Sequence, residues 1–346
     1  MVVGSLPRPE WVKDVIADRS RGRISEKDAD WFLDSAILSG IRMQERAGLD
    51  YISDGEWRRG NYVGVFAERT AGFRKDDNPQ PGRRLQSTHV AARLKPERTI
   101  FADDAAFLRH NTDRKIIMAI PSPFTLGVHL WHPERSVNAY PHQEEFVEEC
   151  ACIIREEIIA LIEIGVDAIQ LDEPWQPWLT DPATYNFHSE EDIRAGVELS
   201  IHTVNSLVEG LGDAFISVHL CHSHNVEGSP EEDKFLPLME AVKRMEVDRF
   251  AMEFNSAASG GFSKLKDFPG NRILGLGVIN TTNKEVETPG EVIARVEAAM
   301  EFVPKERIVL NPDCGFATSA SNPKDLDVAY RKLSVMCRAA ETLRGK

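Results

Sequence analysis

The pattern of the segment FVEECACIIREEIIALIEIGVDAIQLDEP, residues 146–174, predicts a helix followed by a strand. Apolar residues recur in its first half at intervals of three or four, which is typical of one buried helix face. This stripe consists of Phe146, Cys150, Ile154, Ile158 and Leu161. The apolar run Ala168–Leu171 follows without alternating polar positions. Such a run predicts a strand covered on both faces, as in a parallel sheet with helical connections.

The same alternation of helical patterns and apolar runs extends along the chain. The other runs are Val2–Gly4, Tyr51–Ser53, Lys115–Ile120, Phe215–Leu220, Arg249–Met252, Ile273–Leu276 and Arg307–Leu310. Eight strands with helical crossovers in 346 residues predict an α/β fold, a single (β/α)8 TIM barrel, with a doubly wound open sheet as the alternative. The spacing Thr288-Pro289-Gly290-Glu291 predicts a capping box, and Ser321-Asn322-Pro323 predicts the start of the last helix.

Residues 61–113 do not follow this alternation of helical patterns and apolar runs. The middle of the segment, residues 74–84, is polar and rich in Pro, Gly, Asn and Asp. It therefore predicts an insertion after the second strand, at the mouth of the barrel, which serves as a lid or an oligomer contact. No composition shift marks a second domain, so we expect one domain over residues 1–346.

The composition excludes several classes of protein. The chain is 42% hydrophobic and 28% charged, which is typical of a folded globular protein. Its formal net charge of −14 argues against a surface that binds the phosphates of nucleic acids. No apolar stretch approaches the roughly 18 residues of a membrane span, and no secretory leader is recognisable. Five sparse cysteines fit a reducing compartment, so we expect a cytoplasmic protein.

Polar residues that are typical of active sites come directly after the predicted strands. In a barrel, the carboxyl ends of parallel strands meet at one face, where catalytic groups gather. The second strand is followed by residues 54–59, the fourth by Asp172 and Glu173, and the fifth ends in residues 219–224. Glu253 follows the sixth strand, and Asp313 and Cys314 follow the eighth.

His219 and Cys221 are two positions apart on an extended strand, so both side chains leave the same face and can bind one metal ion. Zinc prefers a tetrahedral set of nitrogen and sulfur ligands, and Glu253 and Cys314 at neighbouring strand ends complete such a set. The alternative interpretation is a core histidine beside a small buried thiol.

Five motifs at the predicted strand ends resemble one family. In chain order they are Gly4-Ser5-Leu6-Pro7-Arg8, Asp54-Gly55-Glu56, Ile169-Gln170-Leu171-Asp172-Glu173-Pro174, His219-Leu220-Cys221 and Asn311-Pro312-Asp313-Cys314-Gly315. Together they resemble the C-terminal catalytic barrel of cobalamin-independent methionine synthase, over Val3 to about Leu343. The resemblance implies a barrel that holds Zn²⁺ through His219, Cys221, Glu253 and Cys314. It also implies that Ser5, Glu56 and Asp172 bind homocysteine.

Two departures from the full-length enzyme bear on the methyl donor. That enzyme has an additional N-terminal barrel, whereas we expect a single barrel here. Its seventh-strand turn carries an Asp and a His, where this chain has Asn280-Thr281-Thr282-Asn283. The chain is similar instead to short, single-barrel relatives, which include corrinoid-dependent methionine synthases. The donor is therefore 5-methyltetrahydrofolate or methylcobalamin, the latter through a corrinoid protein partner.

The remaining candidates concern the donor and its proton. Asp313, His222 and His224 are candidates for the acid that protonates the leaving nitrogen. Trp57, Trp175 and Trp178 either stack on a pterin ring or pack a lid. Arg58 and Arg59 either meet a donor carboxylate or lie in water.

The leading hypothesis is thus a zinc-dependent S-methyltransferase that makes methionine from homocysteine, with a small-molecule thiol and a methyl donor as partners. A thiolate bound to zinc is the nucleophile in this mechanism. One alternative is alkyl transfer to another thiol, such as coenzyme M. Others are a porphyrinogen decarboxylase barrel, which needs no such ligands, and a non-catalytic module that binds zinc or a corrinoid protein.

Overall fold

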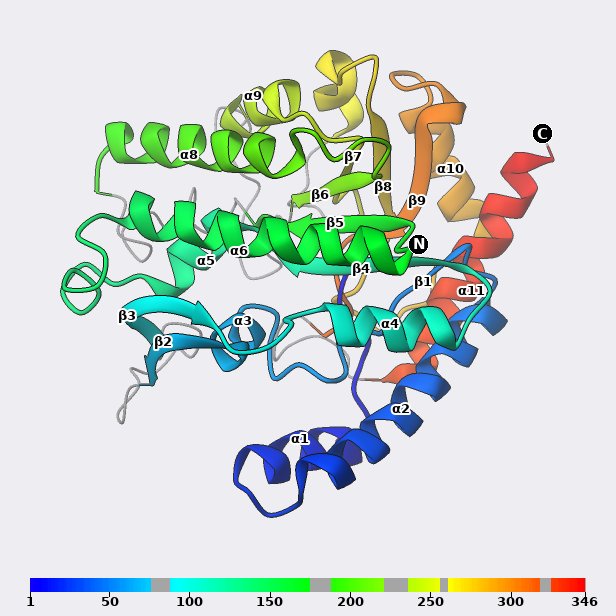
Figure 1. Cartoon of the computed structure of the whole chain (residues 1–346). Helices are drawn as coiled ribbons and strands as arrows, with labels where there is room; N and C mark the ends of the chain where they lie inside the picture. Colours follow the sequence, from blue (N-terminus) through cyan, green and yellow to red (C-terminus); the bar gives the residue numbers. More distant parts are fainter. Residues whose placement is uncertain (76–87, 175–187, 221–235, 256–260, 318–324, 346) are drawn as a thin grey trace.

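The chain folds around a curled parallel β-sheet (Figure 1). The computed structural model describes residues 1–75, 88–174, 188–220, 236–255, 261–317 and 325–345. Within these ranges the sheet has seven strands in the order β1-β4-β5-β6-β7-β8-β9, and each neighbouring pair is parallel. The strands are β1 (Tyr51–Ile52), β4 (Lys115–Pro121), β5 (Ala168–Asp172), β6 (Ile216–Leu220), β7 (Arg249–Met252), β8 (Ile273–Ile279) and β9 (Ile308–Pro312). The predicted α/β barrel class is confirmed.

The strands of the sheet coincide with apolar runs, because side chains on both faces of the sheet are buried. All residues of β6 and β7 are buried. The three polar residues Gln170, Ser217 and Arg249 are in register on β5, β6 and β7. Arg249 Nη2 donates to Gln170 Oε1 at 2.9 Å and to Ser217 Oγ at 3.4 Å, so it provides a donor for both of these buried side chains.

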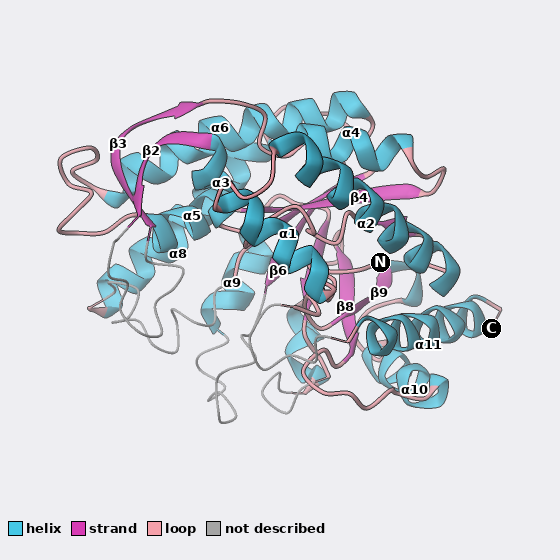
Figure 2. Cartoon of the chain, turned by 90° about the horizontal axis from the view of Figure 1, so that it is seen from below, coloured by secondary structure: helices cyan, strands magenta, loops and turns pink. Residues whose placement is uncertain are grey.

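The helices pack outside the strands, and Figure 2 shows α4, α6, α8 and α11 around them. Neighbouring helices contact one another in the pairs α2–α11, α10–α11, α4–α6, α6–α8 and α8–α9. The helices are α1 (Glu10–Ser20), α2 (Glu26–Ala47), α3 (Gly64–Arg69), α4 (Ala102–His110), α5 (Pro123–Leu130), α6 (Gln143–Ile164), α8 (Glu190–Val208), α9 (Leu236–Arg244), α10 (Pro289–Ala299) and α11 (Leu326–Arg344), with 3-10 turns η5 (Phe262–Asp267) and η6 (Lys305–Arg307). No described helix is long and apolar enough to cross a membrane.

Most predicted helix features are present, with one correction. The apolar stripe of α6 is buried as predicted, including Cys150. Thr288 and Glu291 form the predicted capping box at the start of α10. The start of the last helix was predicted wrongly, because α11 begins at Leu326 instead of at Ser321-Asn322-Pro323. The carboxylate of Asp325 accepts hydrogen bonds from the backbone N–H groups of Asp327 and Val328, and this cap sets the helix start.

The predicted strand Val2–Gly4 is not a strand, although its residues lie where an eighth strand would lie. The Met1 nitrogen donates to Leu310 O of β9 at 3.0 Å, and Leu6 N donates to Gly55 O beyond β1 at 3.1 Å. Gly4 has a φ of +69°, which interrupts the extended backbone. A Cβ on Gly4 would lie 2.9 Å from Glu56 Oε1. Glycine is favoured at residue 4 because residues with a side chain rarely adopt this φ.

The segment 61–113, between β1 and β4, contains no strand of the central sheet among its described residues. It contains α3, the antiparallel pair β2 (Thr70–Lys75) and β3 (Thr88–Pro96), and α4. The edge-on packing of Phe66 and Phe146 against Phe73 of β2 joins this small sheet to α3 and α6. Residues 76–87, which include most of the polar middle of the segment, lie outside the described ranges.

Gly275 of β8 provides a test of the sheet packing. A Cβ at this position would lie 2.6 Å from Asn311 Oδ1 and 2.9 Å from the Cα of Ala251. Gly275→Ala should therefore lower the free energy of unfolding by about 1–3 kcal/mol, measured by denaturant titration, because a tightly packed core does not accept an extra methyl group. Gly270→Ala, where nothing lies within 4 Å, is the matched control. Equal unfolding midpoints for the two variants would contradict the packing described here.

Candidate active site

The candidate site lies at the carboxyl ends of the strands. The described residues that come together there are Glu56 after β1, Asp172 at the end of β5, His219 in β6, Glu253 after β7 and Cys314 after β9. His219, Glu253 and Cys314 are at most 4% exposed. Five candidate residues lie outside the described ranges: Cys221, His222, His224, Trp175 and Trp178.

His219 and Cys314 come together from strand ends that are far apart in sequence. The distance from His219 Nε2 to Cys314 Sγ is 3.5 Å. The other ring nitrogen, Nδ1, lies 3.3 Å from Ala251 O. A hydrogen on Nδ1 would donate to this carbonyl and leave the lone pair of Nε2 facing the thiol. Metal-binding histidines commonly use one ring nitrogen in this way to orient the other.

The His219–Cys314 distance is suitable for a tetrahedral zinc ion. Zn–N bonds of about 2.0 Å and Zn–S bonds of about 2.3 Å, at a tetrahedral angle, place the nitrogen and sulfur roughly 3.5 Å apart. In the part of the chain that the structure describes, no three His, Cys, Asp or Glu side chains form a complete metal cluster. His219 and Cys314 are thus placed as two ligands of a tetrahedral zinc ion would be. The described residues do not place a third ligand with them.

Asp313 ties the end of β9 to the segments after β7 and β8. Its Oδ1 accepts hydrogen bonds from Phe254 N at 3.2 Å and Asn255 N at 3.1 Å, and its N–H donates to Ile279 O at 2.9 Å. Asp313 therefore orients the residues that directly follow Glu253.

Lys264 is a site residue that sequence reasoning missed. Its Nζ lies 4.3 Å from the centre of the Phe254 ring. Burial lowers the pKa of Lys264 to about 8, and the charges of Glu253 and Asp313 oppose this shift. The lysine lies in η5, after a predicted strand end but too far from it in sequence to be selected by that criterion. It brings a positive charge to the acidic side of the site.

Glu56 and Asp172 form an acidic pair. Burial raises the pKa of Glu56, and the nearby Arg59 and Arg8 oppose this shift. Burial also raises the pKa of Asp172 to about 7, and the charge of Glu56 contributes to the increase. Because the charge of Glu56 raises the pKa of Asp172, a bound cation would favour the ionised form of both carboxylates.

The backbone of Glu56 is strained. Its φ of +60° lies in the left-handed region, which residues with a side chain rarely adopt. Asp54 Oδ1 accepts a hydrogen bond from Glu56 N at 3.1 Å, and Arg8 Nη2 donates to Glu56 O at 2.7 Å. These contacts hold both sides of the residue, so the strain is maintained by the surrounding structure.

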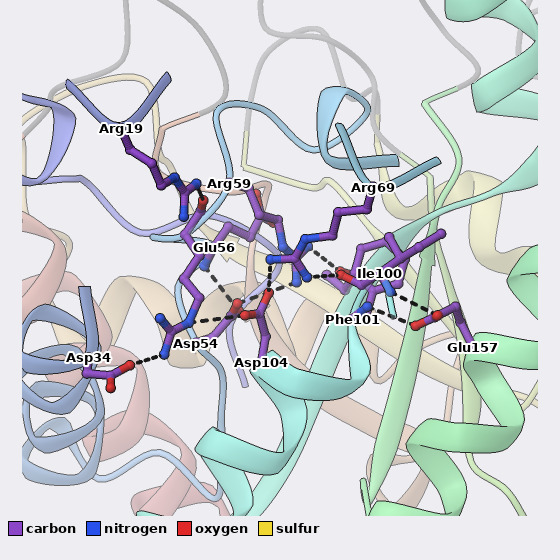
Figure 3. A network of polar contacts seen from close by, with 12 residues as sticks. Arg19, Asp34, Asp54, Glu56, Arg59, Arg69, Ile100, Phe101, Asp104 and Glu157 are labelled. Carbon is purple, nitrogen blue, oxygen red and sulfur yellow. Dashed lines mark hydrogen bonds and ion pairs between the residues drawn. The ribbon is translucent and has the colours of Figure 1, made fainter. Parts of the chain in front are cut away.

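A buried network of arginines and aspartates supports this loop (Figure 3). Arg59 is 1% exposed; its Nη1 donates to Ala119 O at 2.6 Å, and its Nη2 lies 3.4 Å from Asp54 Oδ2. Arg58 pairs with Asp34 and, at 3.1 Å, with Asp104. The expectation that Arg58 or Arg59 lies in water is therefore wrong, since the two guanidinium groups form buried or nearly buried ion pairs.

Glu173 connects three strand ends. Its carboxylate accepts hydrogen bonds from the hydroxyl groups of Ser122, Thr125 and Ser200, the last at 3.1 Å. Its N–H donates to His219 O at 2.9 Å. Because Glu173 directly follows Asp172, this arrangement fixes the backbone between the acidic pair and the candidate metal ligand.

Ser5 lies next to the Cys314 turn. It is 7% exposed, and its carbonyl accepts a hydrogen bond from Phe316 N at 2.7 Å. A Cβ on Gly315 would lie 2.8 Å from Ser5 Oγ, so the turn after β9 packs directly on this hydroxyl. The structure thus brings Ser5 close to the candidate zinc ligand.

Trp57 is located in the core. Its side chain is 0% exposed, and its Nε1 donates to Leu6 O at 3.2 Å. A Cβ on Gly40 of α2 would lie 3.3 Å from the indole ring, which shows how closely the ring packs there. A ring covered in this way has no face available for a pterin, so we leave Trp57 out of the proposed donor site.

Comparisons with known proteins identify relatives along the whole chain. The chain is 29% identical over 347 residues to a methionine synthase of Pyrococcus abyssi, covering 99% of this chain and 92% of the relative. It is 28% identical to a methionine synthase of Saccharolobus solfataricus, covering 99% and 94%. A solved B12-independent methionine synthase from Shewanella sp. W3-18-1, in complex with selenomethionine, has the same fold, with a TM-score of 0.80, 22% identity and coverage of 99% and 97%.

The sequence profile of the family described as "Cobalamin-independent synthase, Catalytic domain" matches residues 1–342. This match includes all the strands of the sheet and all the described residues of the candidate site. The chain therefore belongs to the catalytic-domain family of the cobalamin-independent methionine synthases.

Proposed function

We propose that this protein is a zinc-dependent methyltransferase that converts homocysteine to methionine. The observation that carries the proposal is the 3.5 Å approach of His219 Nε2 and Cys314 Sγ at the same strand ends as the acidic pair. A metal-bound thiolate and an ammonium group are the two features of homocysteine that such a site would recognise. Membership of the family supports the same activity.

His219, Cys221, Glu253 and Cys314 would hold the zinc ion. When bound, zinc supplies a stable thiolate, because coordination lowers the pKa of a substrate thiol far below its ordinary value of about 8.5. Ala251 O orients the His219 ring, and Asp313 orients the residues after Glu253. A set with two thiolates and one carboxylate has an excess of negative charge, which keeps an added sulfur nucleophilic.

Glu56 and Asp172 would bind the ammonium group of homocysteine, with Ser5 beside them. Charge-assisted hydrogen bonds to two carboxylates favour an ammonium and repel the sulfonate of coenzyme M at the same position. This argument disfavours coenzyme M as the acceptor. The bound ammonium also compensates the charge of the acidic pair, which burial alone makes costly.

The proposed methyl donor is 5-methyltetrahydrofolate or a methylcorrinoid. A folate donor needs an acid for its leaving nitrogen. His222 and His224 stay candidates for this role. Asp313 also stays a candidate.

The first test of the proposal is the metal. Purified protein equilibrated with zinc and desalted should contain about one zinc per chain, and Cys314→Ser should lose most of it, because a hydroxyl is a poor zinc ligand compared with a thiolate. Elemental analysis by mass spectrometry measures the zinc content. Cys152→Ser is the matched control, since Cys152 is an exposed free thiol of α6. Full zinc occupancy in Cys314→Ser would exclude this residue as a ligand.

The second test is turnover. Zinc-loaded protein should form methionine from homocysteine with 5-methyltetrahydrofolate or methylcobalamin as donor. Glu56→Gln and Asp172→Asn should each raise the KM for homocysteine at least tenfold without changing the zinc content, because loss of one partner from a desolvated charged pair costs roughly 2–5 kcal/mol.

Glu191→Gln provides the control for this experiment, because Glu191 is exposed on α8. Its KM should equal that of the unmodified protein. Absence of methionine with both donors would overturn the proposed reaction. An unchanged KM in both acidic-pair variants would overturn the proposed ammonium site.

A third test uses the raised pKa of Asp172. With a folded-state pKa of about 7 and an ordinary value of 3.8, the folded protein binds the proton more tightly than the unfolded chain. The stability from this proton is complete below pH 4 and is lost as pH rises towards 7. Asp172→Asn should therefore be more stable, relative to the unmodified metal-free protein, at pH 8 than at pH 4.5. Denaturant titrations at both pH values measure this difference, and a pH-independent difference would contradict the shift.

A further inference from the structure

Lys332 of α11 is a fully buried lysine, with a side chain that is 0% exposed. Its ammonium group donates to Glu287 Oε2 at 3.1 Å, to Asn283 Oδ1 at 3.3 Å and to Glu285 O. A lysine is almost never fully buried unless its charge is paired. The three acceptors use all three N–H groups of the ammonium, and all belong to the segment between β8 and α10. Lys332 therefore attaches the last helix to that segment.

Glu287 connects this ammonium group to the ends of two strands. Its side chain is 8% exposed. While Oε2 accepts from Lys332, Oε1 accepts hydrogen bonds from Asn280 N at 2.8 Å and from Asn255 Nδ2 at 3.1 Å. Asn280 directly follows β8, and Asn255 lies three residues after the end of β7. One buried ion pair thus holds the segments after β7 and β8 against α11.

Asn255 lies between two carboxylates. Its side chain donates to Glu287, and its backbone N–H donates to Asp313 Oδ1 at 3.1 Å. Glu253 comes two residues before Asn255, and Cys314 directly follows Asp313. The contacts of Asn255 therefore join the segment of one proposed zinc ligand to the segment of another.

The surroundings of Asp313 leave little room for adjustment. A Cβ on Gly277 of β8 would overlap Asp313 Oδ1 and would lie 2.7 Å from Met252 O. Phe254 N also donates to Asp313 Oδ1, at 3.2 Å. The ends of β7, β8 and β9 are thus closely packed around this carboxylate. Because a close-packed interior transmits strain, a displacement on one side of Asp313 should also move its neighbours.

We propose that Lys332 is a positioning residue of the metal centre, which sets the separation of Glu253 and Cys314 through Glu287 and Asn255. This inference rests on the proposed function, since it concerns the geometry of the same zinc site. Lys332 acts by compensating the charge of Glu287, because a buried carboxylate without a partner cation is strongly destabilising. Residues that orient the ligands of a metal commonly change its affinity about 10–100-fold when they are mutated.

The test measures zinc affinity and the geometry of the bound metal. Lys332→Met removes the charge and keeps much of the side-chain length. It should weaken zinc binding about 10–100-fold, measured by competition with a chromophoric chelator. When Co²⁺ replaces zinc, Lys332→Met should also show a d–d absorption spectrum different from that of the unmodified protein, because these bands depend on the arrangement of the ligands.

Leu333→Ala is the matched control. Leu333 is also 0% exposed in α11, so its truncation loosens the packing of the same helix. A purely structural contribution of α11 would make Leu333→Ala and Lys332→Met equal in zinc affinity and in cobalt spectrum, and this result would overturn the proposal. Folded Lys332→Met with the zinc affinity and cobalt spectrum of the unmodified protein would overturn it as well.

A double variant separates charge compensation from packing. Glu287→Gln, introduced together with Lys332→Met, removes the uncompensated carboxylate and keeps an amide oxygen for Asn280 N and Asn255 Nδ2. The double variant should bind zinc at least threefold more tightly than Lys332→Met alone. Losses of affinity that simply add across the two single variants would show that the two residues act independently, contrary to the proposal.

Asn255→Ala tests the same connection without altering the ion pair. Asn255 is only half-buried, and the variant keeps the backbone N–H that Asp313 accepts. It should weaken zinc binding at least threefold. If Lys332→Met fails to fold, judged by circular dichroism, Asn255→Ala decides. Zinc affinity equal to that of the unmodified protein would then overturn the proposal.

Failure of the proposed function has a different signature. An unmodified protein that binds zinc but forms no methionine would overturn the proposed reaction, while the comparison of zinc affinities would still test Lys332. An unmodified protein that forms methionine, with zinc binding unaffected by Lys332→Met and Asn255→Ala, would overturn only the role of Lys332. An unmodified protein that binds no zinc would overturn both.

Discussion

The buried ion pair between Arg59 and Asp54 is the interaction on which the candidate site depends most. Asp54 accepts the N–H of Glu56, and Arg59 connects Asp54 to the carbonyl of Ala119 in β4. The loop after β1 is thereby attached to the neighbouring strand. Breaking a buried pair leaves an uncompensated charge, which is far more costly than the net value of the pair itself. The left-handed backbone of Glu56 and the position of its carboxylate both follow from this attachment.

Much of the fold could be predicted from the sequence, because parallel strands buried on both faces have a distinctive apolar pattern. The pattern also indicated His219, Glu253 and Cys314, since each lies at the end of such a strand. Residues 2–4 were predicted as a strand by the same criterion. The backbone there turns at Gly4, where φ is +69°, and the side chain of Glu56 lies close to this turn, a contact that a local pattern does not contain.

The supporting residues were harder to predict for a related reason. Arginine and lysine side chains are usually exposed, so a sequence alone indicates neither the burial of Arg59 nor that of Lys264. Their burial depends on partners from distant parts of the chain: Asp54 and Ala119 for Arg59, and Glu253 and Asp313 near Lys264. The Trp57 ring shows the opposite case, in which a residue next to an acidic motif contributes to packing and not to binding.

The hydrogen bond from Phe316 N to Ser5 O joins the segment after β9 to the start of the chain, and it has a consequence for folding. Ser5 and Cys314 meet only when the segment after β9 has packed against residues 3–5. Contacts of such large sequence separation cost more loop-closure entropy than local contacts do. A ribosome-bound chain that lacks β9 would therefore have most of the sheet and no complete site. The capacity to bind a ligand would appear only after β9 and the Cys314 turn have been added to the sheet.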